Sequence, residues 1–287
     1  MQFLLNVSEM TSKAHESDNG PIDLSALGWH PWPKILLSSD TLNGYGLDLI
    51  FSIAKESGYD GIDLAMWKNI DSRHGNYIAK LMKQHDLSVL VIQTSSKLNA
   101  KELNQAIAIC ESTGATQINI NAPTYFDMRT ASFITNNLPS YIERYPQIHF
   151  NIINPDAGSM TFLPLPQYRF SNIVETVKKL QCWRAVDVAN MDEDMIDTIL
   201  MKRFGSLEKM IHSIYLSDRS SKASHLLLGD GDYNIRQILR MLAENDYQWY
   251  ITTKYTLDME TLVNTDKVML LLEKTINYIR EHYSTDR

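Results

Sequence analysis

The chain has 287 residues, which is long for one average domain but ordinary for a single α/β barrel. Hydrophobic residues make up 44% and charged residues 21% of the sequence, and these proportions exclude a disordered chain, a collagen-like fibre and a membrane bundle. The formal net charge of −7 argues against binding to nucleic acid, because such binding depends on clustered lysine and arginine.

The first 32 residues differ from the rest of the chain. Residues 11–30 are polar and rich in turn formers, and they show no sustained hydrophobic period. We predict that residues 1–32 form an N-terminal extension, with a loop over the end of the following domain and an extra strand over residues 1–7. Residues 33–287 then form the single domain.

Eight short apolar runs of strand length follow one another from residue 33 onward. Their hydrophobicity is continuous rather than alternating, which is typical of strands covered on both faces. The runs occupy residues 33–40, 61–66, 87–94, 116–121, 148–155, 182–190, 212–218 and 248–254.

Segments with helical periodicity lie between these runs, notably over residues 46–58, 98–114 and 233–245. Asn99 and Asp232 stand where N-terminal caps are expected, and Gly58 and Gly114 stand where helices end. A long last helix is predicted over residues 258–282.

The predicted strands begin about 30 residues apart, which is the size of one βα unit. Eight such units in succession predict an α/β fold of the (β/α)8 TIM-barrel type. A doubly wound open sheet is the alternative. The number of consecutive units and the lack of a GxGxxG sequence favour the closed barrel.

A barrel of this kind places its chemistry on the loops that follow the C-terminal ends of its strands. Asp187 follows a run of buried-strand character, so we expect its carboxylate to reach the barrel mouth. Trp67 follows the second strand and is predicted either to stack on the apolar face of a ligand or to pack its own loop. Asp218 is expected to tie down the loop that follows it.

Three segments carry a resemblance to a known superfamily. They are GYDGIDL at residues 58–64, WRAVDVAN at 183–190, and IHSIYLSDRS at 211–220 followed by the LGDGD loop. In this order and spacing they resemble the xylose isomerase-like barrel superfamily, which includes sugar-phosphate isomerases and epimerases and the endonuclease IV group. The resemblance runs from about residue 33 to the end of the chain and implies a small sugar, polyol or sugar phosphate as the ligand.

Members of this superfamily commonly bind a divalent metal through Glu, Asp, His and Glu on the fifth to eighth strands. At the matching positions this chain has Ile153, followed by the expected Asn154, and then Asp187, Tyr215 and Lys254, and Asn190 replaces a further histidine. A hard cation needs several anionic or strongly donating ligands, so we expect no bound metal and no other cofactor. Lys254 is predicted to take over the metal's electrostatic role beside Asp187, and the alternative is a lysine that points into solvent.

The resemblance therefore suggests a sugar isomerase or epimerase whose metal centre has degenerated. Asp187 is the candidate base and Lys254 its charge-stabilising partner. The ligand-binding candidates are Asp63, Trp67, Asn121, Asn154, Asn190, Tyr215, Asp218 and His225.

Two alternatives stay open. One is a non-catalytic sugar-binding or sensor protein on the same fold, and the other is Schiff-base chemistry at Lys254. Endonuclease activity is disfavoured by the net charge and by the missing histidine-rich ligand set. We leave open whether the chain forms a homodimer.

Cys110 and Cys182 form no CxxC sequence and no disulfide framework, which favours a reducing compartment. The first ten residues lack the basic region and cleavage site of a signal peptide, and no run reaches the roughly 20 apolar residues of a membrane span. We therefore predict a cytoplasmic protein with neither a membrane nor nucleic acid as a partner.

Overall fold

The computed structural model describes residues 32–123, 127–156, 175, 177–197 and 210–283. The chain divides into two units, Met1–Trp32 and Pro33–Arg287, and every element named below belongs to the second. The expectations for a loop over residues 11–30 and a strand over residues 1–7 lie outside the described residues.

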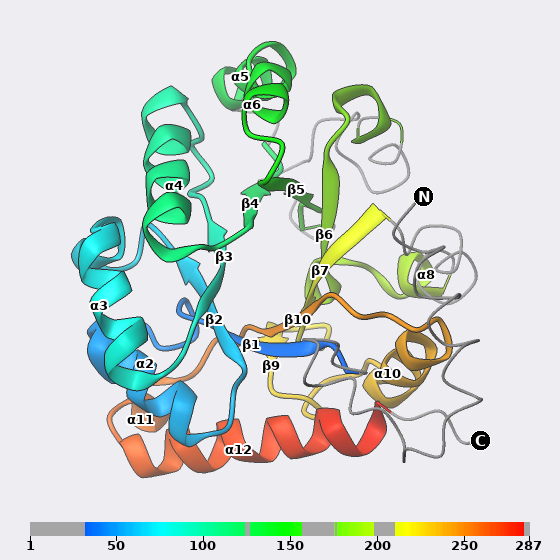
Figure 1. Cartoon of the computed structure of the whole chain (residues 1–287). Coiled ribbons are helices and arrows are strands. Elements are labelled where there is room, and N and C mark those ends of the chain that lie inside the picture. Colours follow the sequence, from blue (N-terminus) through cyan, green and yellow to red (C-terminus); the bar gives the residue numbers. More distant parts are fainter. Residues whose placement is uncertain (1–31, 124–126, 157–174, 176, 198–209, 284–287) are drawn as a thin grey trace, which may run out of the picture. The chain divides into compact units, whose positions relative to one another are not determined.

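Eight parallel strands close into a barrel, and each pairs with the next one along the chain until the last pairs with the first. Figure 1 shows these strands at the centre with helices around them. The predicted (β/α)8 TIM barrel is therefore confirmed. The strands are β1 (Lys34–Ser38), β2 (Gly61–Ala65), β3 (Val89–Gln93), β4 (Gln117–Asn121), β5 (His149–Ile153), β6 (Trp183–Asp187), β7 (Ile211–Leu216) and β10 (Tyr250–Thr253).

Helices lie between the strands. Each of the three segments predicted to be helical, over residues 46–58, 98–114 and 233–245, contains a helix. Asn99 caps α4 (Ala100–Thr113) by accepting a hydrogen bond from Glu102 N, and Gly114 ends the same helix in the left-handed conformation. The other α-helices are α2 (Leu47–Glu56), α3 (Gly75–His85), α5 (Met128–Asn136), α6 (Leu138–Arg144), α8 (Glu193–Met195), α10 (Ile235–Glu244), α11 (Met259–Leu262) and α12 (Thr265–His282), and the 3-10 helices are η3 (Ile70–Arg73) and η6 (Val188–Asn190).

Two helix boundaries differ from the prediction. Asp232 lies in the loop before α10, where its backbone N–H donates to Arg219 O, and Asn234 caps the helix by accepting from Gln237 N. The predicted last helix is two helices, since Asn264 leaves the helical conformation and caps α12 through Lys267 N. Asp258 does cap a helix, but that helix is α11, which ends at Leu262.

A short antiparallel ribbon follows β7 at the C-terminal end of the barrel. It consists of β8 (Asp218–Arg219) and β9 (Ser224–Leu226). Thr256 N donates to His225 O over 2.9 Å, so the ribbon is tied to the segment that follows β10. The ribbon therefore brings residues that follow β7 next to residues that follow β10 at the mouth of the barrel.

The barrel has an apolar outer layer and a polar interior. Ile118 and Ile152 are fully buried in the main hydrophobic core, and they alternate with the interior residues Asn119 and Asn151. Asn151 Nδ2 donates to Asn119 Oδ1 over 2.6 Å, and Asn119 Nδ2 donates to the Tyr215 hydroxyl over 2.7 Å. A connected row of amides and hydroxyls thus fills the interior below the mouth.

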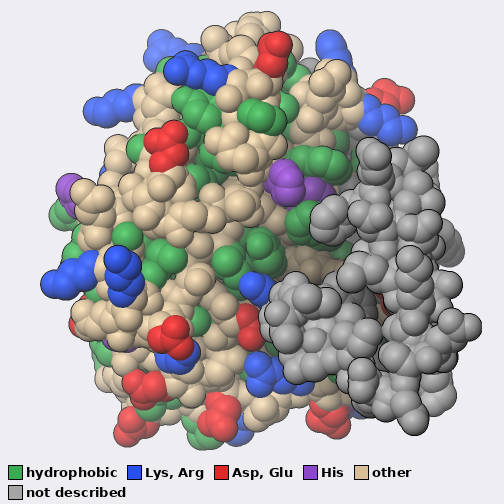
Figure 2. Space-filling model, viewed as in Figure 1, with side chains coloured by type: hydrophobic (Ala, Val, Ile, Leu, Met, Phe, Trp, Pro, Cys, Tyr) green, Lys and Arg blue, Asp and Glu red, His purple; other side chains and the backbone are tan. Residues whose placement is uncertain are grey.

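On the face shown in Figure 2, lysine and arginine side chains are interspersed with aspartate and glutamate over the described surface. They do not gather into a single-sign patch on that part of the face. Among the described helices, none has both the length and the apolar character that crossing a membrane requires.

Candidate functional site

A pocket of about 370 Å³ lies at the C-terminal mouth of the barrel. Its walls come from the segments that follow β1, β2 and β10 and from the ribbon strand β9, so they are brought together by the closure of the barrel. The lining residues are Asp40, Thr41, Asn43, Lys68, His225, Lys254, Tyr255, Thr256, Leu257, Met259 and Leu262.

Asp187 ends β6 and lies behind this lining, with only 1% of its side chain exposed. Its Oδ2 is 3.1 Å from His225 Nε2. Burial raises the pKa of the Asp187 carboxyl, but the neighbouring His225 and Lys254 outweigh burial and bring that pKa below its ordinary value. The carboxylate is therefore charged, and His225 stands between it and the pocket. The expectation that Asp187 itself reaches the mouth needs this correction.

His225 lines the pocket from β9 with 16% of its side chain exposed. Because an ionised carboxylate only accepts hydrogen bonds, Asp187 selects the tautomer in which Nε2 carries the proton. The lone pair is then on Nδ1, which is 3.2 Å from Ser224 Oγ. The backbone of His225 has a φ of 58°, a left-handed conformation that non-glycine residues adopt infrequently and often at functional sites.

Lys254 follows β10 and points into the mouth between two carboxylates. Its Nζ is 4.0 Å from Asp187 Oδ2 and 3.8 Å from Asp40 Oδ2. The ammonium also lies 5.7 Å from the centre of the Tyr215 ring, where the ring face attracts a cation. These contacts give the pairing with Asp187 that the sequence predicts, and the solvent-pointing alternative is wrong.

Asp40 and Lys68 extend this charge cluster to the rim of the pocket. Lys68 Nζ is 2.7 Å from Asp40 Oδ1. Neither residue is among the site candidates predicted from the sequence. Asp40 directly follows the first strand run, so its strand-end position was the available signal, whereas Lys68 lies in a turn and carries no such signal.

Asp63 is fully buried in β2 and is linked to the same cluster. Burial raises the pKa of its carboxyl to about 7, although the Tyr215 hydroxyl and the Lys254 ammonium oppose this rise. A group with this pKa changes charge near neutral pH. Asp63 and Tyr215 are both fully buried and do not line the pocket, and Lys254 Nζ lies over the Tyr215 ring, so the two residues form the floor of the mouth.

The three predicted asparagines hold backbone in place. Asn154 Oδ1 accepts from Asp187 N over 2.6 Å and its Nδ2 donates to Asp187 O over 3.0 Å. Asn190 Nδ2 donates to Asn154 O, and Asn121 Nδ2 donates to Thr94 O. Asn154 thus fixes the strand end that carries Asp187. A ligand-binding role for these amides stays a prediction.

Asp218 ties down a loop, as the sequence analysis expects. Its carboxylate accepts from the backbone N–H groups of Arg219, Gly229 and Tyr233 at 2.8–3.1 Å. A Cβ at Gly231 would lie 2.3 Å from Asp218 Oδ1, so only glycine allows this approach. Trp67 lies half-buried in the turn after β2 and does not line the pocket.

The donor set does not fit the divalent metal that the resemblance implies. The Lys254 ammonium lies between Asp40 and Asp187 and repels a second cation. Asn154 uses both side-chain polar atoms on the Asp187 backbone. In the described ranges, no three His, Cys, Asp or Glu side chains are arranged to hold a metal ion.

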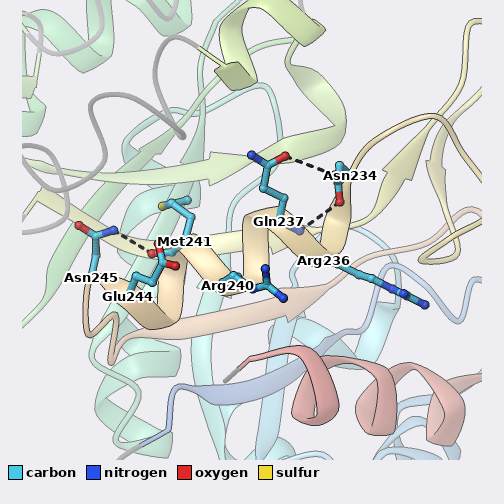
Figure 3. A pocket seen from close by; sticks show the side chains of 7 residues that line it. All are labelled: Asn234, Arg236, Gln237, Arg240, Met241, Glu244 and Asn245. Carbon is cyan, nitrogen blue, oxygen red and sulfur yellow. Dashed lines mark hydrogen bonds between the residues drawn. The ribbon is translucent and has the colours of Figure 1, made fainter. Parts of the chain in front are cut away.

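A second pocket, of about 460 Å³, runs along α10 (Figure 3). Its seven lining side chains all come from this helix and its two flanking caps. Asn234 bonds Gln237, and Asn245 Nδ2 donates to Met241 O over 2.8 Å. These amides serve the helix ends, so the barrel mouth is the stronger candidate for a functional site.

No family model matches the sequence, and no curated protein sequence is similar to it. Solved structures share its fold at low sequence identity. A xylose isomerase domain protein from Alicyclobacillus acidocaldarius has a TM-score of 0.67 and 13% identity over 88% of this chain and 100% of that one.

Two further structures have almost the same similarity. A D-allulose 3-epimerase from Methylomonas sp. has a TM-score of 0.65 and 12% identity over 88% of this chain and 98% of that one. An AP endonuclease of family 2 from Brucella melitensis has a TM-score of 0.65 and 14% identity over 87% of this chain and 98% of that one. The chain therefore has the fold of the xylose isomerase-like barrels, and this fold carries more than one activity.

Proposed function

We propose that this protein is an isomerase or epimerase that moves a proton at a carbon next to a carbonyl group in a small sugar-like compound. The observation that carries the proposal is the contact of His225 with both the pocket and the buried carboxylate of Asp187. A base that faces a pocket and is oriented by a second group from behind is the arrangement that proton abstraction requires.

The roles follow from which ring nitrogen of His225 carries the lone pair. In the tautomer that Asp187 selects, the lone pair is on Nδ1 and accepts from the Ser224 hydroxyl over 3.2 Å. When the hydroxyl turns away from this nitrogen, Nδ1 takes the proton from the substrate carbon. Asp187 stabilises the imidazolium that forms, and it keeps Nε2 protonated throughout.

For isomerisation, the imidazolium returns the proton to the former carbonyl carbon while the proton of the neighbouring hydroxyl passes to the oxyanion, so the carbonyl moves to the adjacent carbon. For epimerisation, water protonates the opposite face of the original carbon, because His225 reaches only one face, and the imidazolium then loses its proton to solvent. This assignment makes His225 the base and Asp187 its positioning partner.

Lys254 supplies the positive charge that the reaction needs. When the C–H bond breaks, its electrons form a carbon–carbon double bond and the carbonyl oxygen becomes an oxyanion. The Lys254 ammonium is held in the mouth by Asp40, Asp187 and the Tyr215 ring, so it is in place before this charge develops. We propose that it acts in place of a divalent metal.

The test is exchange of the substrate's carbon-bound hydrogen in deuterium oxide. The chelator-treated protein is incubated with a panel of aldoses, ketoses and their phosphates, and deuterium incorporation is followed by mass spectrometry. We expect incorporation into at least one compound, and its loss in His225→Gln and Lys254→Met. Lys55→Met is the matched control, because Lys55 pairs with Asp86 on the outer surface. Incorporation that survives His225→Gln would contradict the assignment.

A non-catalytic sugar-binding protein is the second candidate. The lowered pKa of Asp187 favours it, because a carboxylate stabilised in its charged form is a weak base by itself. Ligand-induced thermal stabilisation without deuterium incorporation or product would support this alternative.

Schiff-base formation at Lys254 is supported less well. An amine must be neutral to attack a carbonyl, and the two carboxylates near Nζ stabilise the charged ammonium. Borohydride reduction with a ketose should leave no mass adduct on Lys254.

A further inference from the structure

The mouth pocket has two chemically different walls. Asp40, Lys68, His225 and Lys254 form a charged wall, which comes from the ends of β1, β2 and β10 and from β9. The segment after β10 forms the other wall, where Tyr255 and Thr256 are followed by the apolar side chains of Leu257, Met259 and Leu262. A fully hydroxylated sugar would place hydroxyl groups against these three apolar side chains, which offer no hydrogen bond.

The apolar wall is held firmly in position. The Tyr45 hydroxyl donates to Leu262 O, which ties α11 to the loop after β1. Tyr255 N donates to Thr41 Oγ1 over 3.0 Å, and Asp258 Oδ1 accepts from Thr261 N over 2.6 Å at the start of α11. These bonds come from both sides of the segment, so its apolar side chains are presented to the pocket by a fixed backbone.

Met259 differs from its neighbours in its exposure. Leu257 and Leu262 pack partly against the main hydrophobic core, whereas 73% of Met259 is exposed. A thioether chain is flexible and adapts to the shape of an apolar group. Binding of an apolar group here would remove both the group and Met259 from water, which is favourable.

We infer that the ligand of this pocket is a hydroxy-carbonyl compound with an alkyl or aryl substituent, and not a free sugar hydroxylated along its whole length. The inference rests on the proposed function for the reacting end of the ligand. The hydroxy-carbonyl end lies between His225 and Lys254, and the substituent lies on the wall of Leu257, Met259 and Leu262. A volume of about 370 Å³ is at the small end of the range for ligand pockets, which suits a compound of this size.

The test uses straight-chain 1-hydroxy-2-ketones, from hydroxyacetone to 1-hydroxyhexan-2-one, with D-ribulose as the hydroxylated reference. Binding is measured by NMR titration. We expect the affinity to rise by about fourfold for each methylene group that is fully buried. The six-carbon ketone should bind at least about tenfold more tightly than hydroxyacetone, and more tightly than D-ribulose.

Two variants in α11 test whether the apolar wall causes the dependence of affinity on chain length. Met259→Gln should reduce the dependence of affinity on chain length, and Leu262→Ala provides a second position on the wall. Val263→Gln is the control, because Val263 is 76% exposed and does not line the pocket, and the dependence should persist in it. An affinity that does not vary with chain length, or one that varies equally in Met259→Gln, would overturn the inference.

The same compounds separate this inference from the proposed function. Chain-length-dependent binding without deuterium incorporation would support the ligand class and remove the proposed chemistry. Deuterium incorporation into free ketoses, with no effect of chain length on binding, would overturn the ligand class and leave the chemistry standing.

Discussion

The two ends of the barrel each hold a histidine, and the two side chains have opposite surroundings. At the N-terminal end, the His212 ring lies between two indoles, with its centroid 4.1 Å from Trp183 and 3.7 Å from Trp249. At the C-terminal mouth, His225 contacts the Asp187 carboxylate and lines a pocket. His212 packs among the Trp183 and Trp249 indoles and the His149 ring, whereas His225 is paired with a charge.

The difference has a clear electrostatic consequence at the N-terminal end. Burial, together with a smaller contribution from the neighbouring His149, lowers the pKa of His212 to about 3. A histidine that stays neutral at every physiological pH serves packing. Because the residue type is the same at the two ends, the role of each histidine depends on what its side chain contacts.

The largest effect that sharpens this comparison is on proton transfer. His225→Gln should reduce deuterium incorporation by about 10²- to 10⁴-fold, the usual contribution of a general base. His212→Gln should leave the rate per folded molecule nearly unchanged. Equal losses in both variants, measured on protein shown to be folded by circular dichroism, would break the distinction between the two ends.

The next largest effect is on stability, and here the substitution of His212 should have a larger effect than that of His225. His212→Ala leaves a gap between Trp183 and Trp249, and we expect the free energy of unfolding to fall by about 2–4 kcal/mol. His225→Asn should cost less, because asparagine tolerates the left-handed backbone at this position. Urea unfolding of both variants measures the two costs, and a larger cost at His225 would contradict this order.

The smallest effect is the slope of stability with pH. The pKa of His212 falls from 6.5 when unfolded to about 3 when folded, so between these values the unfolded chain binds more protons. Stability from this residue is therefore complete above pH 6.5 and is lost as the pH falls, with a slope of at most about 1.4 kcal/mol per pH unit.

Asp63 in the floor of the mouth should give the opposite slope. Its pKa rises from 3.8 to about 7 on folding, so the folded chain binds more protons between these values. Stability should fall as the pH rises from about 4 to 7. Urea midpoints of His212→Gln and Asp63→Asn across this range separate the two slopes, and a slope that is unchanged in either variant would contradict the corresponding pKa.

Sequence patterns were sufficient for the eight barrel strands because each of these strands is buried on both faces, whereas the partly exposed ribbon of β8 and β9 was not predicted. The run over residues 116–121, for example, differs from β4 (Gln117–Asn121) by a single residue. Helix boundaries were predicted less well where a distant contact decides them. Asp232 suits an N-terminal cap by residue type, but its backbone is bound to Arg219, and only the fold shows that bond.

The sequence predicted several residues of the candidate site, but not the contacts between them. Strand-end position identified Asp187 and Lys254, because a barrel brings all strand ends to one mouth. The contact between His225 and Asp187 joins residues 38 positions apart through the inserted ribbon, and no spacing rule predicts it. The position of Asn154 at a strand end did not reveal that its side chain binds the backbone of Asp187, because an amide group can bond a ligand or a neighbouring strand equally well.

The account depends most on the claim that the Lys254 ammonium occupies the place of a divalent cation. Calorimetric titration of the chelator-treated protein with Mn²⁺ tests it most directly, with Lys254→Glu measured in parallel. We predict no stoichiometric binding by the unaltered chain. In the variant, the introduced carboxylate would join Asp40, Asp187 and His225 as a ligand set, and we predict that binding appears. Stoichiometric Mn²⁺ binding by the unaltered chain that is lost in Asp187→Asn would contradict the claim.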